Sequence, residues 1–246
     1  MADIRVFGGP TALIEFGGLR FLTDPTFDQP GSYPSGDRVL TKTAPTAVTP
    51  AELGPVDAVL LSHDEHPDNL DTSGRAFLAT APLVLVTRSG AGRLGGSARG
   101  LAPWESVELP RPDGGTVTVT AVPAQHGPDG CEPVIGEVIG FMLTAADLPS
   151  LYVSGDNASL AVVKEIADRF GPVDTALLFA GAARTLIFDG ALLTLDSAQA
   201  AEAAAVLGAR RVVPAHFDSW GHFTEGREAL EAAFTAAGLA DRLQFC

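Results

Sequence analysis

Short apolar runs of strand length alternate with turn signals in the first part of the chain. Residues 3–7 and 11–16 are two such runs, separated by Gly-Gly-Pro, and a third begins at residue 19 after a Gly-Gly pair. Runs of this length bounded by glycine and proline are typical of β-strands, so the pattern predicts a meander. From Asp28 to Pro55 the chain is instead rich in proline, glycine, serine and threonine. We expect a long loop there with about one turn of helix, of the kind that often carries function.

Strands and helices are both predicted in the rest of the chain. Apolar residues in VDAVLLSH, LVLVT, TVTVTAVPAQH, GFMLTA and SLYVSGD predict further strands. Helices are predicted over residues 158–170, 197–207 and 225–237. Asn157 would cap the first helix, and a capping box would begin the second at Asp196. A last strand is expected in RLQFC.

Strands in two groups, each followed by helices, predict an α/β protein in which two packed sheets carry helices on their outer faces. The chain has 246 residues and 46% hydrophobic content, enough to bury a large core. No linker or low-complexity segment divides it. We therefore expect a single domain over residues 1–246.

Charge and cysteine usage limit the classes of function. There are 30 acidic residues against 16 lysines and arginines, so the field of the protein would repel nucleic acid. The two cysteines cannot form a disulfide framework and indicate a reducing compartment. The start of the chain is neither basic nor apolar, and no run is long enough to span a membrane. We expect a cytoplasmic protein that acts on a small molecule, with assembly into a homo-oligomer left open.

All five histidines lie at or just beyond the ends of apolar runs. They are His63 and His66 in SHDEHPDNLD, His126 in VPAQH, and His216 and His222 in VPAHFDSWGHF. A turn that follows a strand can aim imidazoles and carboxylates at a common point, where they suit zinc, iron or manganese. For the first segment alone, the alternative is an exposed polar turn whose aspartate and asparagine only cap the next helix.

The other histidines favour a shared metal site. His126 and His216 each follow a strand that ends in proline and a small residue, and Asp156 follows the strand in SLYVSGD. Strands of one sheet end at a common edge, so residues at these ends can meet. The pattern therefore predicts a metal centre at one edge of the sheets.

In these motifs the chain resembles the metallo-β-lactamase-fold hydrolases, and within them the branch that includes L-ascorbate-6-phosphate lactonase. The resemblance rests on TALIEFGGLRFLTDPTF, SHDEHPDNLD, the isolated His126, the Gly155–Asp156 pair and the closing VPAH, in this order over nearly the whole chain. It implies a four-layer αββα sandwich of two mixed sheets flanked by helices, with metals at one edge of the two sheets.

The resemblance also implies a ligand set for two metal ions. The first ion would have three histidines, the second an aspartate and a histidine, and one aspartate would bridge both. These residues are His63, His66 and His126 for the first ion, Asp68 and His216 for the second, and Asp156 as the bridge.

The chain departs from the family pattern in one segment. The family reads His-X-His-X-Asp-His, whereas this chain has one more residue between His63 and His66, and Asn69 where the last histidine is expected. If Glu65 is looped out, His66, Asp68 and Asn69 fall into the family register. Glu65 as the second ligand stays open as the alternative. Because Asn69 is a neutral donor or no ligand at all, we expect the second ion to be held more weakly.

The expected chemistry is metal-assisted hydrolysis. One or two divalent ions, zinc or manganese with iron as an alternative, would bring the pKa of a bound water to about 7. The resulting hydroxide would be the nucleophile, and Asp68 would orient it and accept a proton. With two carboxylates and one hydroxide the centre keeps about one positive charge, which suits a small anionic ester, lactone, amide or phosphoester.

Further residues are candidates for contacts behind the metals or with the substrate, in addition to Asn69. Asp24 in LTDP would hydrogen-bond a ligand histidine, or would only turn the chain before the next proline. Arg184 is either an anion contact or an ordinary surface arginine. His222 is either a packing residue or a substrate contact.

Two other functions stay open at this point. An iron-dependent redox enzyme on the same fold would contain iron and need oxygen or thiol. A non-catalytic metal-binding protein is compatible with Asn69 in place of a histidine. The segment LLTLDSAQ also lacks the substrate-contacting histidine expected in lactonase-like members, which argues against the specific sugar-phosphate lactone activity.

Overall fold

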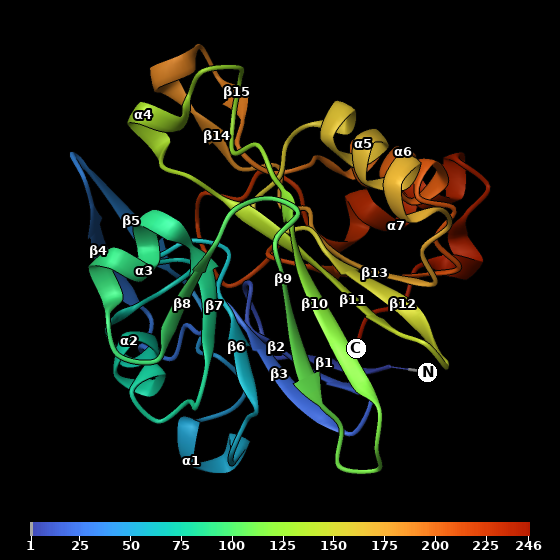
Figure 1. The fold of residues 1–246 in the computed structure, drawn as a ribbon. Coiled ribbons are helices and arrows are strands. Elements are labelled where there is room, and N and C mark those ends of the chain that lie inside the picture. Colours follow the sequence, from blue (N-terminus) through green and yellow to red (C-terminus); the bar gives the residue numbers. More distant parts are fainter. Residues whose placement is uncertain (1) are drawn as a thin grey trace.

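Two six-stranded β-sheets pack face to face and carry helices on their outer surfaces in the computed structural model, which describes residues 2–246 (Figure 1). The strand order is β1-β2-β3-β6-β7-β8 in one sheet and β16-β13-β12-β11-β10-β9 in the other. The expected αββα sandwich of two mixed sheets is therefore confirmed. Among the described residues, no helix is long and apolar enough to cross a membrane.

The elements of the two sheets and of the helical layers are short. The first sheet contains β1 (Asp3–Val6), β2 (Ala12–Phe16), β3 (Leu19–Thr23), β6 (Ala58–Leu60), β7 (Val84–Thr87) and β8 (Ala98–Leu101). The second contains β9 (Ser106–Pro110), β10 (Thr116–Pro123), β11 (Ile139–Ala145), β12 (Leu148–Val153), β13 (Thr175–Phe179) and β16 (Arg211–Ala215). Two separate hairpins are formed by β4 (Gly31–Ser35) with β5 (Arg38–Lys42) and by β14 (Arg184–Thr185) with β15 (Ala191–Leu192). The helices are α1 (Pro50–Leu53), α2 (Thr72–Leu78), α3 (Arg88–Leu94), α4 (Glu132–Ile135), α5 (Leu160–Phe170), α6 (Ser197–Val206) and α7 (Arg227–Ala236), with 3₁₀ turns η1 (Leu186–Phe188) and η2 (Ala240–Arg242).

Side chains from both sheets fill the space between them. Ile14 and Phe21 of the first sheet and Phe141 and Phe179 of the second belong to this central core and are fully buried. Complete burial of a side chain of this size is worth about 1.5–3 kcal/mol relative to exposure. Further apolar layers pack α5, α6 and α7 against the second sheet and α2 and α3 against the first. Both faces of each sheet are therefore covered.

The sandwich brings the carboxyl ends of several strands to one edge. Strands β3, β6 and β7 run parallel in the first sheet, and β12, β13 and β16 run parallel in the second. Residues that closely follow these strands gather at that edge: Asp24 after β3, His63 after β6, Asp156 after β12 and His216 after β16. The candidate ligands thus lie where both sheets end.

The three predicted helices are present, and in one of them the N-cap residue differs from the prediction. Helix α6 begins at Asp196 with the expected capping box. Helix α5 begins two residues later than expected, because its N-cap is Ser159, whose side chain accepts a hydrogen bond from the amide of Val162. Asn157 instead accepts hydrogen bonds from the amides of Ser159 and Gln125, so it joins the helix start to the loop after β10.

Two expectations about irregular segments were wrong. The segment from residue 28 to residue 55 contains the expected turn of helix, α1, but it is not otherwise a long loop, because it also forms the β4–β5 hairpin, with Pro34 in one strand. The last segment, RLQFC, is not a strand. Leu243 forms an isolated bridge with Val212, the amide of Gln244 donates to the carbonyl oxygen of Val212, and the carbonyl oxygen of Cys246 accepts from the amide of Val6, but these contacts do not form a continuous ladder.

A buried lysine fixes the base of the β4–β5 hairpin. Lys42 Nζ donates hydrogen bonds to the carbonyl oxygen of Thr26 at 2.9 Å and to Thr46 Oγ1 at 3.2 Å, and it lies 3.4 Å from Asp71 Oδ2. The side chains of Lys42 and Asp71 are 1% and 0% exposed. Asp71 also caps α2 through the amide of Gly74. The pair therefore joins the hairpin to helix α2.

We expect Lys42→Met to destabilise the protein strongly, because it leaves Asp71 as an uncompensated buried charge. Losing one partner of such a pair costs about 3–5 kcal/mol. The matched control is Lys164→Met, since Lys164 pairs with Asp168 with both side chains 67% exposed, and such pairs contribute only about 0–1 kcal/mol. Urea unfolding measures both variants, and equal losses would contradict the structural role of Lys42.

Candidate metal centre

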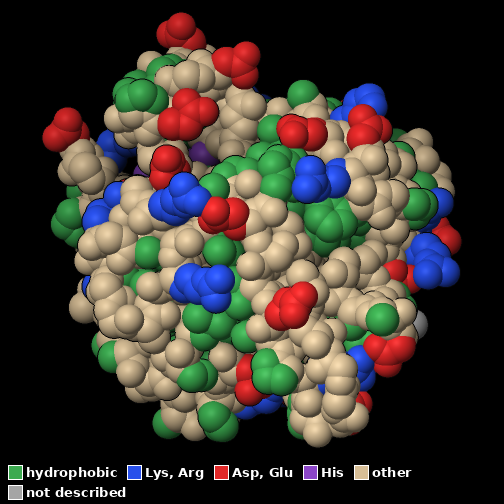
Figure 2. All heavy atoms as spheres, viewed as in Figure 1, with side chains coloured by type: hydrophobic (Ala, Val, Ile, Leu, Met, Phe, Trp, Pro, Cys, Tyr) green, Lys and Arg blue, Asp and Glu red, His purple; other side chains and the backbone are tan. Residues whose placement is uncertain are grey.

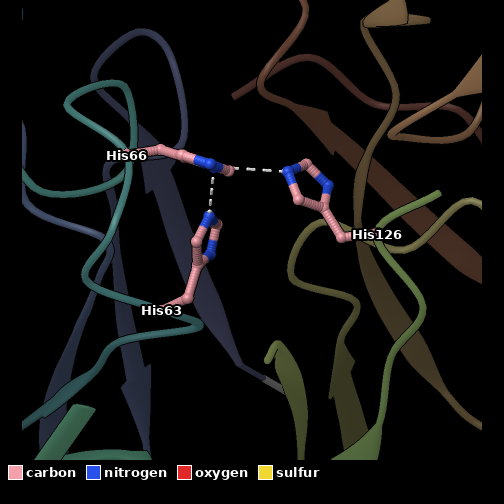
Figure 3. A group of neighbouring side chains, drawn as sticks. All are labelled: His63, His66 and His126. Carbon is pink, nitrogen blue, oxygen red and sulfur yellow. Dashed lines mark hydrogen bonds between the residues drawn. The ribbon is translucent and has the colours of Figure 1, made fainter. Parts of the chain in front are cut away.

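Three histidine side chains converge at the edge where the sheets meet (Figure 3). His63 and His66 come from the turn after β6, and His126 comes from the loop after β10. His63 Nε2 lies 2.9 Å from His66 Nδ1, and His126 Nε2 lies 3.3 Å from the same atom. Nitrogens that bind one zinc ion at 2.0–2.1 Å in tetrahedral geometry are roughly 3.3 Å apart. One divalent ion therefore fits this triad.

Hydrogen bonds on the far side of two rings leave their Nε2 atoms free for a metal. His63 Nδ1 donates to Ser62 Oγ at 2.9 Å, and Ser62 Oγ donates in turn to Asp24 Oδ1 at 2.8 Å. His126 Nδ1 donates to the carbonyl oxygen of Leu193 at 2.7 Å. Such partners fix the tautomer and orientation of metal-binding histidines. The structure thus places Asp24 behind a triad histidine, with Ser62 between them.

The protein environment keeps His63 and His66 neutral, as metal binding requires. Burial, together with the neighbouring His66, holds the pKa of His63 well below its usual value. Burial and His126 lower the pKa of His66 to about 4. Both rings are therefore neutral at pH 7, and a metal does not have to displace a proton from them.

Glu65, the alternative second ligand, points away from the triad. Its Oε1 pairs with Arg93, and its Oε2 accepts a hydrogen bond from the amide of Asp64 at 3.2 Å. Arg93 also binds the Asp64 carboxylate, with Nη2 2.5 Å from Oδ1. The structure therefore brings His66, and not Glu65, to the triad, which favours the register with Glu65 looped out.

Two carboxylates and two further histidines form a second cluster beside the triad. His216 Nε2 lies 3.5 Å from Asp68 Oδ2 and 3.4 Å from Asp156 Oδ1. Asp156 Oδ2 lies 3.7 Å from His126 Nε2, so this carboxylate faces both groups with different oxygens. His222 Nε2 lies 3.1 Å from Asp68 Oδ2. The position of Asp156 suits the bridging role that the sequence indicates.

Positive and negative charges alternate in this second cluster. Burial by itself would lower the pKa of His216, but Asp156 and Asp68 raise it to about 10. Burial would raise the pKa of Asp156, yet His216 and His126 hold it well below its usual value. His216 and His222 do the same for the pKa of Asp68, again against burial. A protonated His216 thus places a positive charge between two carboxylates, as a cation would.

Several buried polar atoms of the second cluster have no hydrogen-bond partner among residues 2–246. They include Asp68 Oδ1 and Asn69 Oδ1. Each unsatisfied buried group of this kind costs about 1–3 kcal/mol. A divalent cation accepts oxygen and nitrogen donors together, so it would satisfy these atoms in one step. The residues present therefore fit a second ion whose ligands are richer in oxygen than those of the first.

His222 and Asn69 both lie at the second cluster. Asn69 Nδ2 donates to Asp156 Oδ1 at 3.3 Å, while the ring of His222 packs on Phe223 with centroids 4.4 Å apart. The structure thus places His222 at Asp68, where sequence analysis offered only packing or a substrate contact. The sequence signal for this position was the turn-forming Ser-Trp-Gly before His222, which brings the chain back toward the end of β16.

The backbone is strained where ligand residues leave their strands. Asp24 and His216 have φ angles of 30° and 55°, a left-handed region that residues other than glycine rarely adopt. Gly155, with φ of 57°, directly precedes Asp156, and a Cβ at this position would come within 2.6 Å of the carbonyl oxygen of Ile139. Only glycine therefore fits the turn that presents Asp156.

A hollow of about 720 Å³ opens onto His66 (Figure 2). The β4–β5 hairpin, α3, α4 and η1 surround it. Arg38 lines the hollow, donates to Thr185 Oγ1 at 3.2 Å and forms no ion pair within the described part of the chain. Arg184, the expected anion contact, is exposed, does not line the hollow and donates to the carbonyl oxygen of Gly190. The free cation at the hollow is therefore Arg38, from the segment expected to be a loop.

Solved structures of other proteins share the fold of this chain. A solved structure of isothiocyanate hydrolase from Delia radicum gut bacteria has a TM-score of 0.82 at 20% identity, covering 100% of this chain and 96% of that one. CmlA, a diiron beta-hydroxylase from Streptomyces venezuelae, has a TM-score of 0.65 at 20% identity over 97% of this chain and 50% of its own. At these identities the two structures show the fold alone.

The sequence relatives identify the family. The family model described as "Beta-lactamase superfamily domain" matches residues 19–217. A protein of Methanosphaerula palustris named "UPF0173 metal-dependent hydrolase" is 30% identical over 184 residues, which are 72% of this chain and 75% of the relative. With this match and a buried histidine triad able to hold a metal, the chain belongs to the UPF0173 metal-dependent hydrolases of the beta-lactamase superfamily.

Proposed function

We propose that this protein hydrolyses a small ester, lactone, amide or phosphoester with one or two divalent metal ions. The observation that carries the proposal is the pair of adjacent donor groups at one strand edge, joined by Asp156. The hollow beside them has the volume of a small-molecule site, for which about 300–1,000 Å³ is usual. A sugar-phosphate lactone is one member of this substrate range and has no separate support.

The proposed ligand set places His63, His66 and His126 on the first ion. Asp68 and His216 would hold the second, and Asp156 would contribute to both. When bound, the ions would lower the pKa of water to about 7 and polarise the oxygen under attack. Asp68 would orient the attacking water and accept its proton, and Arg38 would contact a negative group on the substrate from the wall of the hollow.

The test is elemental analysis and turnover of the purified protein beside His63→Ala. We expect the variant to lose the first metal and at least about a hundredfold in kcat/KM on phenyl acetate, γ-butyrolactone or p-nitrophenyl phosphate, whichever the parent protein cleaves. Arg184→Ala is the matched control, because its side chain lies outside the hollow. Full metal content in His63→Ala would contradict the ligand set. No turnover of any panel member by protein loaded with zinc, manganese or iron would contradict the hydrolase on these substrates.

Metal binding should release more protons at the second site than at the first. The pKa of His66 is about 4 and that of His63 lies well below its usual value, so neither of these rings loses a proton to the first ion between pH 6 and 8. The pKa of His216 is about 10, so the second ion must displace one proton throughout this range. Affinity for the second ion should therefore fall about tenfold for each unit by which the pH is lowered. Calorimetry of metal-free protein in buffers of different ionisation enthalpy measures both steps, and equal proton release would contradict the assignment.

We also propose that His222 supplies the imidazole that the family pattern puts at position 69. Asn69 contacts Asp156, and His222 contacts Asp68. Both side chains therefore lie at the second cluster, each beside a different carboxylate. His222, in the loop after β16, can thus provide the metal-binding imidazole that the family pattern places in the turn after β6.

A rescue experiment separates this role from packing. His222→Ala should weaken binding of the second ion at least about tenfold, by removal of one ligand. Adding Asn69→His to His222→Ala should restore it, since the new imidazole faces the same cluster. Metal stoichiometry by equilibrium dialysis is the measurement. If His222→Ala keeps two ions, or if the second substitution does not restore the lost one, His222 is not a ligand.

An iron-dependent redox enzyme is the second candidate, because the second cluster is rich in oxygen donors and the fold is similar to that of a diiron hydroxylase. Iron as the native metal, together with oxygen consumption in place of hydrolysis, would favour it over the hydrolase.

A further inference from the structure

Large exposed apolar side chains are concentrated around the hollow that opens onto His66. Within residues 2–246 the exposed large hydrophobic residues are Val39, Val134, Leu186, Ile187 and Val206. All except Val206 belong to the β4–β5 hairpin, α4 or η1, the segments that surround the hollow. Apolar side chains gathered in this way at one site, and not scattered singly, mark a binding surface.

Two of these side chains form a wall of the hollow itself. Val134 and Ile187 line it and are 59% and 54% exposed. Pro133 and Ile135 of α4 line it beside them. This wall is continuous with His66, a residue of the triad. A molecule whose reacting group lies at the triad would therefore place its remaining part against α4 and η1.

The polar side of the same hollow carries little free positive charge. Arg93 is paired with Asp64 and Glu65, which leaves Arg38 as the unpaired cation among the described lining residues. Three further acidic residues line the hollow, namely Asp37, Glu132 and Glu137. A small, highly charged anion would therefore meet one unpaired arginine, three carboxylates outside any ion pair within residues 2–246, and an apolar wall.

We propose that the substrate is amphipathic: its scissile group lies at the metal centre, and an unbranched or ring-shaped apolar group of several carbons lies against Val134 and Ile187. This inference rests on the proposed function for the scissile group, but the apolar wall can be tested by binding alone. A second copy of the chain is the less favoured occupant, because the carboxylates around the hollow and the net charge of −14 would repel each other across such an interface.

The experiment uses straight-chain hydroxamic acids from acetohydroxamic to hexanohydroxamic acid, which bind metal at one end, with zinc-loaded protein. Affinity should rise about twofold to fourfold for each added methylene that leaves water. Val134→Ser with Ile187→Ser should reduce this rise to less than about 1.5-fold per methylene and leave the affinity for acetohydroxamic acid unchanged. Val206→Ser, an exposed apolar residue of α6 outside the hollow, should behave like the parent protein. All three side chains are exposed, so the substitutions do not disturb the core.

The outcomes separate this inference from the proposed function. A flat series in the parent protein, or a rise that persists in the double variant, overturns the apolar wall. Light scattering tests the alternative occupant. If the parent protein is a dimer, the double variant is a monomer and the rise in affinity persists, the patch is an interface between copies and the apolar wall is overturned. Turnover of p-nitrophenyl acetate, butyrate and hexanoate is measured in parallel. If affinity rises with chain length but no ester is turned over, the apolar wall is supported and hydrolysis is contradicted. If the esters are turned over at rates that do not depend on chain length, hydrolysis is supported and the apolar wall is contradicted.

Discussion

The neutralisation of Asp68 and Asp156 is the constraint on which the site depends. Both carboxylates are 5% exposed or less, and an ionised carboxylate in a protein interior costs several kcal/mol unless it is paired. The chain supplies the compensating charge from His216, which lies within 3.5 Å of both. A divalent cation would do the same with twice the charge. His216 adopts a strained left-handed conformation with its ring between both carboxylates, and this charge compensation offsets the strain.

The packing of the two sheets creates the site as well as the core. His63 and His66 follow a strand of the first sheet, whereas His126, Asp156 and His216 follow strands of the second. The distances within the triad therefore depend on how the central core holds the sheets together. Phe179, a core residue at the end of β13, also packs on the ring of His216 with centroids 5.2 Å apart. At this edge, the same contact therefore belongs to the core and positions a candidate ligand.

The candidate site residues that directly follow strands could be predicted from the sequence. Those whose positions depend on the path of an irregular loop could not. His63, His126, Asp156 and His216 stand directly after apolar runs, so their common edge could be inferred from periodicity and strand topology. The position of His222 could not, because a loop of irregular backbone sets it. Composition also misled at the β4–β5 hairpin, whose proline and glycine content is typical of a loop although its strands pair in register. Its base is held by buried Lys42, a long-range contact with no local signal.

The charge distribution around the hollow affects how any substrate can be recognised. The net charge of −14 repels anions at a distance, and the field of a positive metal centre would act only over about 8 Å at physiological ionic strength. Electrostatic steering into the hollow is therefore weak, and Arg38 is the single unpaired cation among its described lining residues. Recognition must then come from contacts made after the substrate has entered. Burial of apolar surface provides such contacts without a long-range field, so an acidic protein with an apolar wall beside its ligands is better suited to an amphipathic substrate than to a highly charged one.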